Sequence, residues 1–134
     1  MTGRNYDWAL LLLRLTFGGL MIINHGWGKM LKLFGEGPVQ FADPLGIGAE
    51  PSLWLAVLGE VVCPILLVLG LFTRLAALPA LITMLVAAFI VHAGDPFADK
   101  EHALLFAIPY AILFLLGPGR YSVDHWWEQR QIAR

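Results

Sequence analysis

Charged residues are scarce in this chain, and the apolar residues between them form long runs. Asp, Glu, Lys and Arg make up 14% of the 134 residues, whereas 58% are hydrophobic. A soluble domain carries about 25% charged residues. The net charge is −1, so the chain has no basic excess with which to bind nucleic acid. This composition predicts an integral membrane protein and argues against a soluble domain.

Cysteine is also nearly absent. Cys63 stands alone and no CxxC pair occurs, which excludes a disulfide framework or a dithiol redox centre within one chain. No cleavable signal is expected, since the first apolar run, from Trp8, is too long and lacks a small-residue cleavage site. The short alternating patterns of β-barrel strands are missing as well. Helices are the other way to satisfy every backbone group in lipid, so we expect an all-α fold.

Four apolar segments are each long enough to cross the hydrocarbon layer. We expect a single domain over residues 1–134, a membrane-embedded antiparallel four-helix bundle with spans at about 8–29, 52–72, 75–93 and 98–116. Gly and Pro interrupt the chain near the ends of these segments, and short connections make neighbouring helices antiparallel. Thr73 is the expected N-cap of the third helix.

The tail and the positions of Lys and Arg predict how the bundle lies in the membrane. The tail places Trp126, Trp127 and Ile132 among charged residues, which is typical of a short interfacial helix. Arginines gather near the N-terminus, the connection between the second and third helices, and the tail, whereas lysines gather on the other side. This bias predicts that both termini are cytoplasmic.

Ionisable side chains inside the predicted helices are the candidate functional residues, because burying them in a membrane is costly. At 1.5 Å per residue, His25 and His92 lie about 10 Å outward of mid-span and Glu60 about 3 Å outward. Side chains tilt toward their own helix N-terminus, which brings these three to one depth. The candidate ligand-binding residues are Arg14, Asn24, His25, Lys29, Glu60, His92 and His102, and the catalytic candidates among them are His25, Glu60 and His92.

Three kinds of ligand are compatible with this group. A quinone needs hydrogen-bond donors at its carbonyls and a route for protons, which His and Glu supply. A bis-His haem needs two histidines at equal depth on facing helices, as His25 and His92 are expected to be. A metal ion held by His25, Glu60 and His92 is the third possibility. Structural interpretations stay open too, since the polar core can serve only for hydrogen bonding and Arg14 can snorkel to the surface.

The chain resembles the DoxX family of bacterial and archaeal membrane proteins over nearly its whole length. The resemblance rests on short motifs: Arg14-Leu15 through Gly18, His25-Gly26-Trp27-Gly28-Lys29, Phe34-Gly35, Gly59-Glu60, Gly70-Leu71-Phe72-Thr73-Arg74-Leu75-Ala76-Ala77, Val91-His92 and Gly117-Pro118-Gly119-Arg120-Tyr121-Ser122-Val123-Asp124. It implies a four-helix protein of the inner (plasma) membrane with a redox role. The family name derives from subunits of an archaeal thiosulfate:quinone oxidoreductase, and another member is described as a membrane partner of redox enzymes.

These observations lead to a hypothesis and two alternatives. The leading hypothesis is a membrane subunit of a respiratory or redox complex that binds quinone. Glu60 would accept protons, the histidines would donate hydrogen bonds and Arg14 would balance charge. As an enzyme it would be at most a quinone-linked oxidoreductase subunit that needs a protein partner, or it would act as a homo-oligomer. The alternatives are a scaffold that recruits a partner without chemistry of its own, and a proton-coupled carrier.

Overall fold

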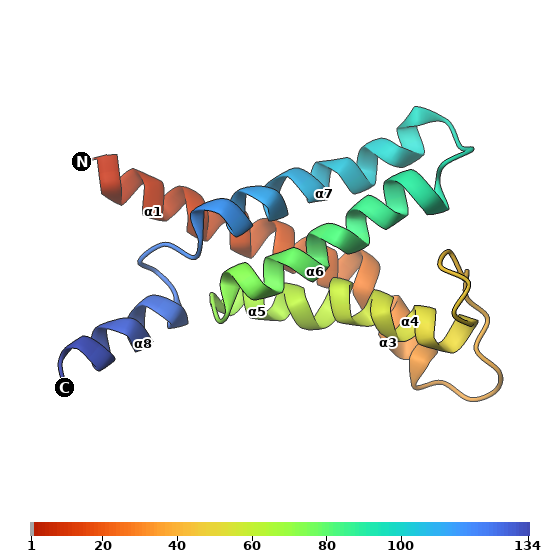
Figure 1. The fold of residues 1–134 in the computed structure, drawn as a ribbon, viewed down its shortest axis with the longest axis horizontal. Coiled ribbons are helices and arrows are strands. Elements are labelled where there is room, and N and C mark those ends of the chain that lie inside the picture. Colours follow the sequence, from red (N-terminus) through yellow and green to blue (C-terminus); the bar gives the residue numbers. More distant parts are fainter. Residues whose placement is uncertain (1) are drawn as a thin grey trace.

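The computed structural model describes residues 2–134, which form five helical rods joined by four connections (Figure 1). The first rod is continuous through α1 (Thr2–Leu13), η1 (Arg14–Gly18), α2 (Gly19–Met21), η2 (Ile22–Gly26) and α3 (Trp27–Leu33). The second comprises α4 (Ala49–Val57), η3 (Leu58–Val62) and α5 (Cys63–Leu69), and the third α6 (Thr73–Val86) and η4 (Ala87–Val91). The fourth and fifth are α7 (Phe97–Leu116) and α8 (Val123–Ile132). Segments η1 to η4 are π-helical turns within longer helices, and residues 2–134 contain no strand, so the all-α prediction is confirmed.

Three rods are long and apolar enough to cross a membrane, over Gly3–Leu33, Ala49–Leu69 and Thr73–Val91. The fourth predicted span, 98–116, forms the 20-residue helix α7. Asp99, Lys100 and Glu101 follow one another near its start, so charge and not length separates α7 from the other three. The tail helix α8 is present as predicted, and Ser122 is its N-cap.

A tight turn at residues 70–72 joins the second and third rods. Gly70 has the left-handed φ of 69°, and the Leu71 N–H donates to the Leu66 carbonyl oxygen at 2.9 Å. This is the Schellman pattern that commonly ends a helix, and a glycine suits it because no Cβ opposes the positive φ. The second rod therefore ends at Leu69, three residues before the predicted 72.

The predicted N-cap at Thr73 is wrong. Thr73 is already the first residue of α6, and Phe72, with φ 48°, stands before it. The cap is supplied by a residue far along the chain: the Asp124 carboxylate accepts the Phe72 N–H at 2.7 Å and the Thr73 N–H at 2.9 Å. A carboxylate at a helix N-terminus satisfies unpaired N–H groups and the positive end of the helix dipole.

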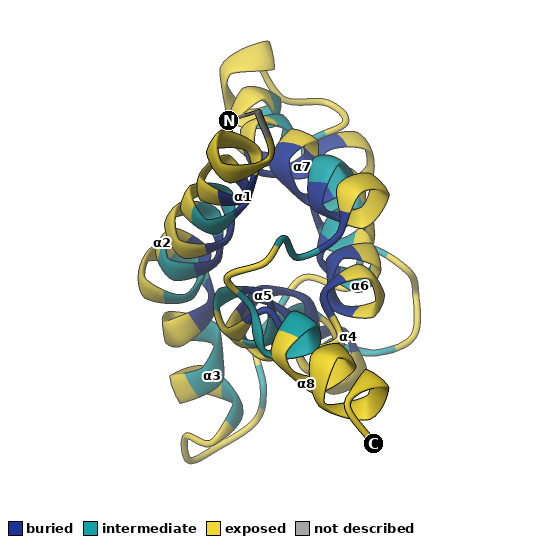
Figure 2. Cartoon of the chain, turned by 90° about the vertical axis from the view of Figure 1, so that its left-hand side faces the viewer, coloured by how far each residue is buried: buried dark blue, intermediate teal, exposed yellow. Residues whose placement is uncertain are grey.

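The four long rods pack around a shared core. The first rod contacts α5 and α7, and α6 contacts both α5 and α7, so each rod has two neighbours. Figure 2 shows the buried faces of α1, α5, α6 and α7 turned toward one another. Large apolar side chains cover the outside, among them Ile23 at 73% exposed and Leu75 at 71%. A largely apolar exterior is the arrangement expected of a protein surrounded by lipid.

The two ends of the bundle differ in shape. One end, which we call the Arg14 end, contains the turns at 70–72 and 117–122 together with α8. At the opposite end, the His25 end, α6 and α7 diverge from α3 and α4, and the long connection 34–48 lies beside them (Figure 1). The helices are therefore closed at the Arg14 end and spread at the His25 end.

Candidate functional site

A cavity of about 420 Å³ opens between the rods at the His25 end. Five of the seven predicted ligand-binding residues line it, and they come from four different rods or their ends. Met21, Met84 and Ala103 supply apolar wall between them. The polar residues of the cavity that the sequence predicted are His25, Lys29, Glu60, His92 and His102. The structure thus brings together side chains that are up to 77 residues apart.

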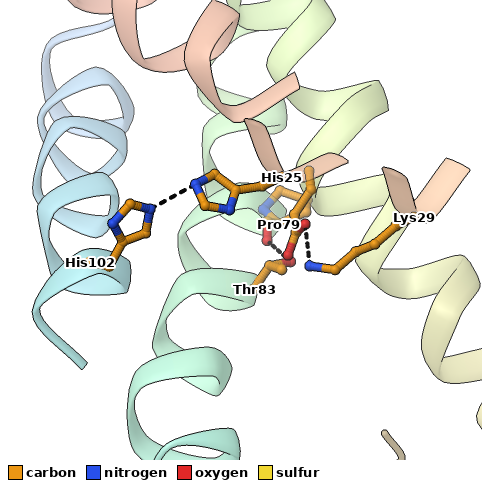
Figure 3. A network of polar contacts seen from close by, with 6 residues as sticks. His25, Lys29, Pro79, Thr83 and His102 are labelled. Atoms are coloured by element: carbon orange, nitrogen blue, oxygen red, sulfur yellow. Dashed lines mark hydrogen bonds and ion pairs between the residues drawn. The ribbon is translucent and has the colours of Figure 1, made fainter. Parts of the chain in front are cut away.

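His25 and His102 face each other at the mouth of this cavity. Their Nε2 atoms are 2.7 Å apart, so one imidazole donates a hydrogen bond and the other accepts it. Phe106 packs on both rings, with its centroid 5.6 Å from each. Figure 3 shows His25 between His102 and Lys29. This pair links the first rod to α7 at the spread end of the bundle.

Lys29 and Glu60 form the only ion pair with a buried carboxylate at this end, as far as residues 2–134 are described. The Lys29 Nζ donates to Glu60 Oε2 at 2.5 Å, and the Glu60 side chain is 6% exposed. Lys29 is 29% exposed, so its ammonium reaches toward the surface while it neutralises the carboxylate. A charged pair in an apolar surrounding interacts more strongly than it would in water.

Glu60 is placed by an unusual backbone. It lies in the π-helical turn η3, and Pro64 has no N–H with which to bond the Glu60 carbonyl as an α-helix requires. Gly26 packs directly against that carbonyl, and a Cβ on Gly26 would overlap it. The absence of a side chain at Gly26 therefore allows the first and second rods to approach closely beside Glu60.

Three of the four rods that line the cavity contain a π-helical turn at or next to their cavity residue. His25 lies within η2, Glu60 within η3, and His92 directly follows η4, where its N–H donates to the Ala87 carbonyl five residues earlier. π-Helical turns are rare and occur frequently at functional sites, since each one rotates the following side chains away from the α-helical positions. The rise of 1.5 Å per residue used for the depth prediction describes an ideal α-helix, which contains no π-helical turns.

His92 lies at the rim of the cavity. Its Nδ1 is 2.7 Å from Asp95 Oδ2, and both side chains are partly exposed. Lys100 closes the same turn by donating to the Ala93 carbonyl at 3.0 Å. Asp99 also lines the cavity and was not among the predicted residues. It could have been found from its spacing to His102, because residues three apart share one face of a helix.

A second, apolar cavity lies beside the first. This groove, of about 430 Å³, runs between the second and third rods and is covered by the 34–48 connection. Its walls carry aliphatic side chains such as Leu58 and Ile82, and Phe41 and Leu45 cover it from the connection. The groove and the polar cavity share four lining residues: Lys29, Glu60, Ala87 and His92. The ion pair therefore lies on the wall between an apolar and a polar space.

The cover of the groove is fixed by Asp43. Its carboxylate accepts the N–H groups of Ile47 and Gly48 at 2.9 and 2.8 Å, and the Ser52 hydroxyl at 2.9 Å. These hydrogen bonds, the one from Gly48 first, hold the pKa of Asp43 below its usual value. Asp43 thereby joins the connection to the start of α4.

Arg14 does not belong to the cavity, so its predicted place beside His25 is wrong. It is 1% exposed and lies at the Arg14 end, eleven residues before His25, or about 16 Å along a helix. Its guanidinium donates to the Leu67 and Tyr121 carbonyls at 2.9 and 2.8 Å, and further to Val68 and Pro118. Arg14 thus satisfies carbonyl groups at the end of α5 and in the 117–122 turn.

Asn24 is the second correction. Its side chain is exposed on the outer side of η2, whereas its neighbour His25 is partly buried toward the cavity. Cys63 is buried and packs in the apolar core. The missed residue with the clearest structural role is Asp124, whose only signal was its place in the closing motif of the chain.

His25 and His92, the pair considered for haem and for a metal ion, each form a hydrogen bond with another side chain. His25 is bonded to His102 and His92 to Asp95. Ligation through His25 Nε2 would first require breaking its bond to His102. Among residues 2–134, no group of three or more His, Cys, Asp or Glu side chains could hold a metal ion.

Comparison with known proteins places this site in a family. The DoxX family profile matches residues 9–93, a range that includes His25, Lys29, Glu60 and His92. A protein of Haemophilus influenzae described as uncharacterized is 33% identical over 112 residues, which cover 78% of this chain and 81% of that protein. An uncharacterized membrane protein of Mycobacterium tuberculosis is 33% identical over 132 residues, covering 86% of this chain and 79% of its own length.

A third relative carries a localisation in its name. Inner membrane protein YqjF of Escherichia coli is 29% identical over 111 residues, covering 78% of this chain and 82% of that protein. No solved structure shows significant similarity to the chain. The family match over most of the first three rods, the length of the aligned relatives and the apolar helices agree with one another. The chain is a membrane protein and belongs to the DoxX family.

Proposed function

We propose that this protein binds a quinone, or an apolar redox ligand of similar shape, beside the Lys29–Glu60 pair, as the membrane subunit of a redox complex. The observation that carries the proposal is the place of this pair on the wall between the polar cavity and the apolar groove. Sites for small ligands typically measure about 300–1,000 Å³ and combine apolar walls with few polar groups. A polar ring with an apolar tail matches a cavity joined to a groove.

The residues of the wall have complementary capacities. Lys29 can donate a hydrogen bond to a carbonyl oxygen, and Glu60 can accept or release a proton while Lys29 compensates its charge. His92 can donate from the opposite rod, since it lines both spaces. A bound quinone would supply reversible two-electron, two-proton chemistry at this position. Leu58 and Ile82 would contact its tail within the groove.

The proposal includes a topology. All four long rods would cross the membrane as an antiparallel bundle, with the charged start of α7 at the outer interface and both termini in the cytoplasm. Asp99, Lys100 and Glu101 lie near the start of α7, where a membrane–water interface would hydrate them. Helix α8, with exposed Trp126 and Trp127, would lie on the cytoplasmic surface. Electrons would come from a partner redox protein.

Binding of a quinone with a decyl tail to the purified protein tests this function. Titration calorimetry in detergent should give saturable binding to the wild type. Glu60→Gln and Lys29→Met should each weaken binding about tenfold or more, because each removes a charge-assisted hydrogen bond. The same ring without a tail should bind more weakly than the decyl compound, since it leaves the groove empty.

Matched controls lie nearby. Glu50→Gln and Lys32→Met make the same chemical changes at exposed positions of α4 and α3, and they should bind like the wild type. Equal affinities for the wild type, Glu60→Gln and Lys29→Met would refute the site. If no variant and no wild-type sample binds, the protein is better described as a scaffold that recruits a partner.

A further inference from the structure

The His25–His102 pair connects the polar cavity with the exterior. His102 is exposed on the first part of α7, whereas His25 is partly buried and lines the same cavity as Lys29 and Glu60. The two rings meet through Nε2 atoms 2.7 Å apart, within the range of a hydrogen bond. Polar groups that line one cavity therefore lead from the surface at the His25 end toward the ion pair.

The other direction is closed. Phe106 is 7% exposed and packs on both imidazoles, and Phe17 meets its ring edge at a centroid distance of 5.5 Å. Below it, Tyr110 is fully buried and its hydroxyl donates to the Phe17 carbonyl at 3.0 Å. These aromatic residues lie between the histidine pair and the Arg14 end, so the series of polar groups does not continue toward that end.

We propose that His25 and His102 form a proton relay that serves the Lys29–Glu60 site from the His25 end of the bundle. The inference rests on the proposed function. Conversion of a quinone to a quinol takes two electrons from a reductant and two protons, which form two O–H bonds. A proton that passes from Nε2 of His102 to Nε2 of His25 makes an imidazolium, and the ring then releases its Nδ1 proton to an oxygen of the reduced quinone. His102 regains its proton from the aqueous side, and once His25 has returned to its starting tautomer a second transfer supplies the second proton.

The charged groups around the relay come from every rod that meets the cavity. Lys29 follows His25 by one helical turn, Glu60 faces it from η3, and His92 lies across the cavity. Asp99 stands one turn before His102 on the same helix and also lines the cavity. This carboxylate lies toward the exterior, where it can attract a cation or a proton donor.

Two variants of His102 separate a relay from a structural contact. His102→Gln keeps a side chain that can hydrogen bond to His25 but cannot pass a proton on, and His102→Ala removes the contact. With protein in excess over decyl quinone and dithionite as the reductant, stopped flow should show reduction slowed about tenfold or more in both. Added imidazole should restore the rate in His102→Ala, since the exposed position leaves room for a free ring. His125→Ala, which changes a partly exposed histidine on α8 away from the cavity, is the matched control and should behave like the wild type.

The hydrogen bond between His25 and His102 can also be measured in the protein without a ligand. In ¹⁵N-histidine NMR, the wild type should show scalar coupling across an N–H···N hydrogen bond between two imidazoles, and His102→Gln should lose it. A wild-type rate in His102→Gln, or slow reduction in His102→Ala that imidazole does not restore, would overturn the relay. Calorimetry keeps the two proposals apart: unchanged quinone affinity with an unchanged rate refutes the relay alone, whereas absent wild-type binding refutes the site on which it rests.

Discussion

The two ends of the bundle use polar residues in opposite ways. At the Arg14 end, charged side chains bond to the backbone: Arg14 to four carbonyl groups, and Asp124 to two N–H groups. Around the cavity at the His25 end, side chains bond to other side chains, in the pairs Lys29–Glu60 and His25–His102. The first kind of contact satisfies fixed peptide groups, and the second surrounds a cavity.

This difference separates structure from function within one set of buried ionisable residues. Backbone carbonyls need a hydrogen-bond donor in every state of the folded chain, so a buried side chain that bonds to them contributes to the stability of the fold. A pair of side chains around an open space can exchange its partners for a ligand. We therefore expect substitutions at the Arg14 end to change stability, and those at the His25 end to change binding more than stability.

Arg14→Met should have the largest effect on stability. The change leaves the Leu67 and Tyr121 carbonyls and their neighbours without a donor in a buried place, which should cost roughly 3–5 kcal/mol. Denaturant titration in mixed micelles measures it. Arg74→Met is the control, because Arg74 is exposed and makes a single long bond of 3.3 Å to Leu115. Similar losses in both variants would contradict the assignment of Arg14 as the residue that closes this end.

Gly26→Ala should come next. Its new Cβ would overlap the Glu60 carbonyl, a backbone atom that cannot move without shifting the second rod. We expect a loss of about 1–3 kcal/mol and weaker ligand binding, because Glu60 would be displaced. Gly28→Ala, two residues further along the same rod, is the matched control, because a Cβ there meets nothing within 4 Å. It should stabilise the protein by up to about 1 kcal/mol through helix propensity.

Asp124→Ala should have a smaller effect. The variant loses the carboxylate that caps the start of α6, and capping residues contribute about 1 kcal/mol. Quinone binding should not change, since the cap lies at the other end of the bundle from the cavity. Glu128→Ala, on the exposed part of α8, should leave both stability and binding unchanged. A binding defect in Asp124→Ala with normal stability would break the division between the ends.

The smallest effect concerns pH and the cover of the groove. The pKa of Asp43 is lower in the folded state than in the unfolded chain, so its hydrogen bonds stabilise the 34–48 connection above the unfolded pKa of about 3.9. That contribution is lost as the pH falls through the folded pKa. The protection factors of the Ile47 and Gly48 amides against hydrogen exchange should fall only in this acidic range. Asp43→Asn should show low protection of both amides at every pH.

Much of the fold could be predicted because apolar length and turn residues determine it locally. The runs that begin near Trp8 and Ser52, and the glycines at 70 and 117, define the rods to within a few residues. The cap at α6 could not be predicted in this way, since its carboxylate comes from Asp124, 51 residues after Thr73. Long-range contacts between polar side chains and backbone leave little periodic signal in a sequence.

The sequence predicted the residues at the centre of the cavity better than the full set of residues that line it. Depth along the helices grouped His25, Glu60 and His92, which line one cavity, because the π-helical turns are single short turns that change the height of the following residues little. Angular position around the first rod is harder to predict, since η1 and η2 are wider than α-helical turns. Arg14 and Asn24 were predicted as ligand-binding residues because they are polar and lie within the first predicted span, although neither lines the cavity.

The contacts of Arg14 constrain when the protein can finish folding during synthesis. Arg14 leaves the ribosome first, and the carbonyl groups of Pro118 and Tyr121 follow 104 and 107 residues later. Until then its guanidinium lacks half of its partners, and the start of α6 lacks Asp124. The helices can enter the bilayer one after another, but this end of the protein reaches its final structure only after the segment 117–124 has been made.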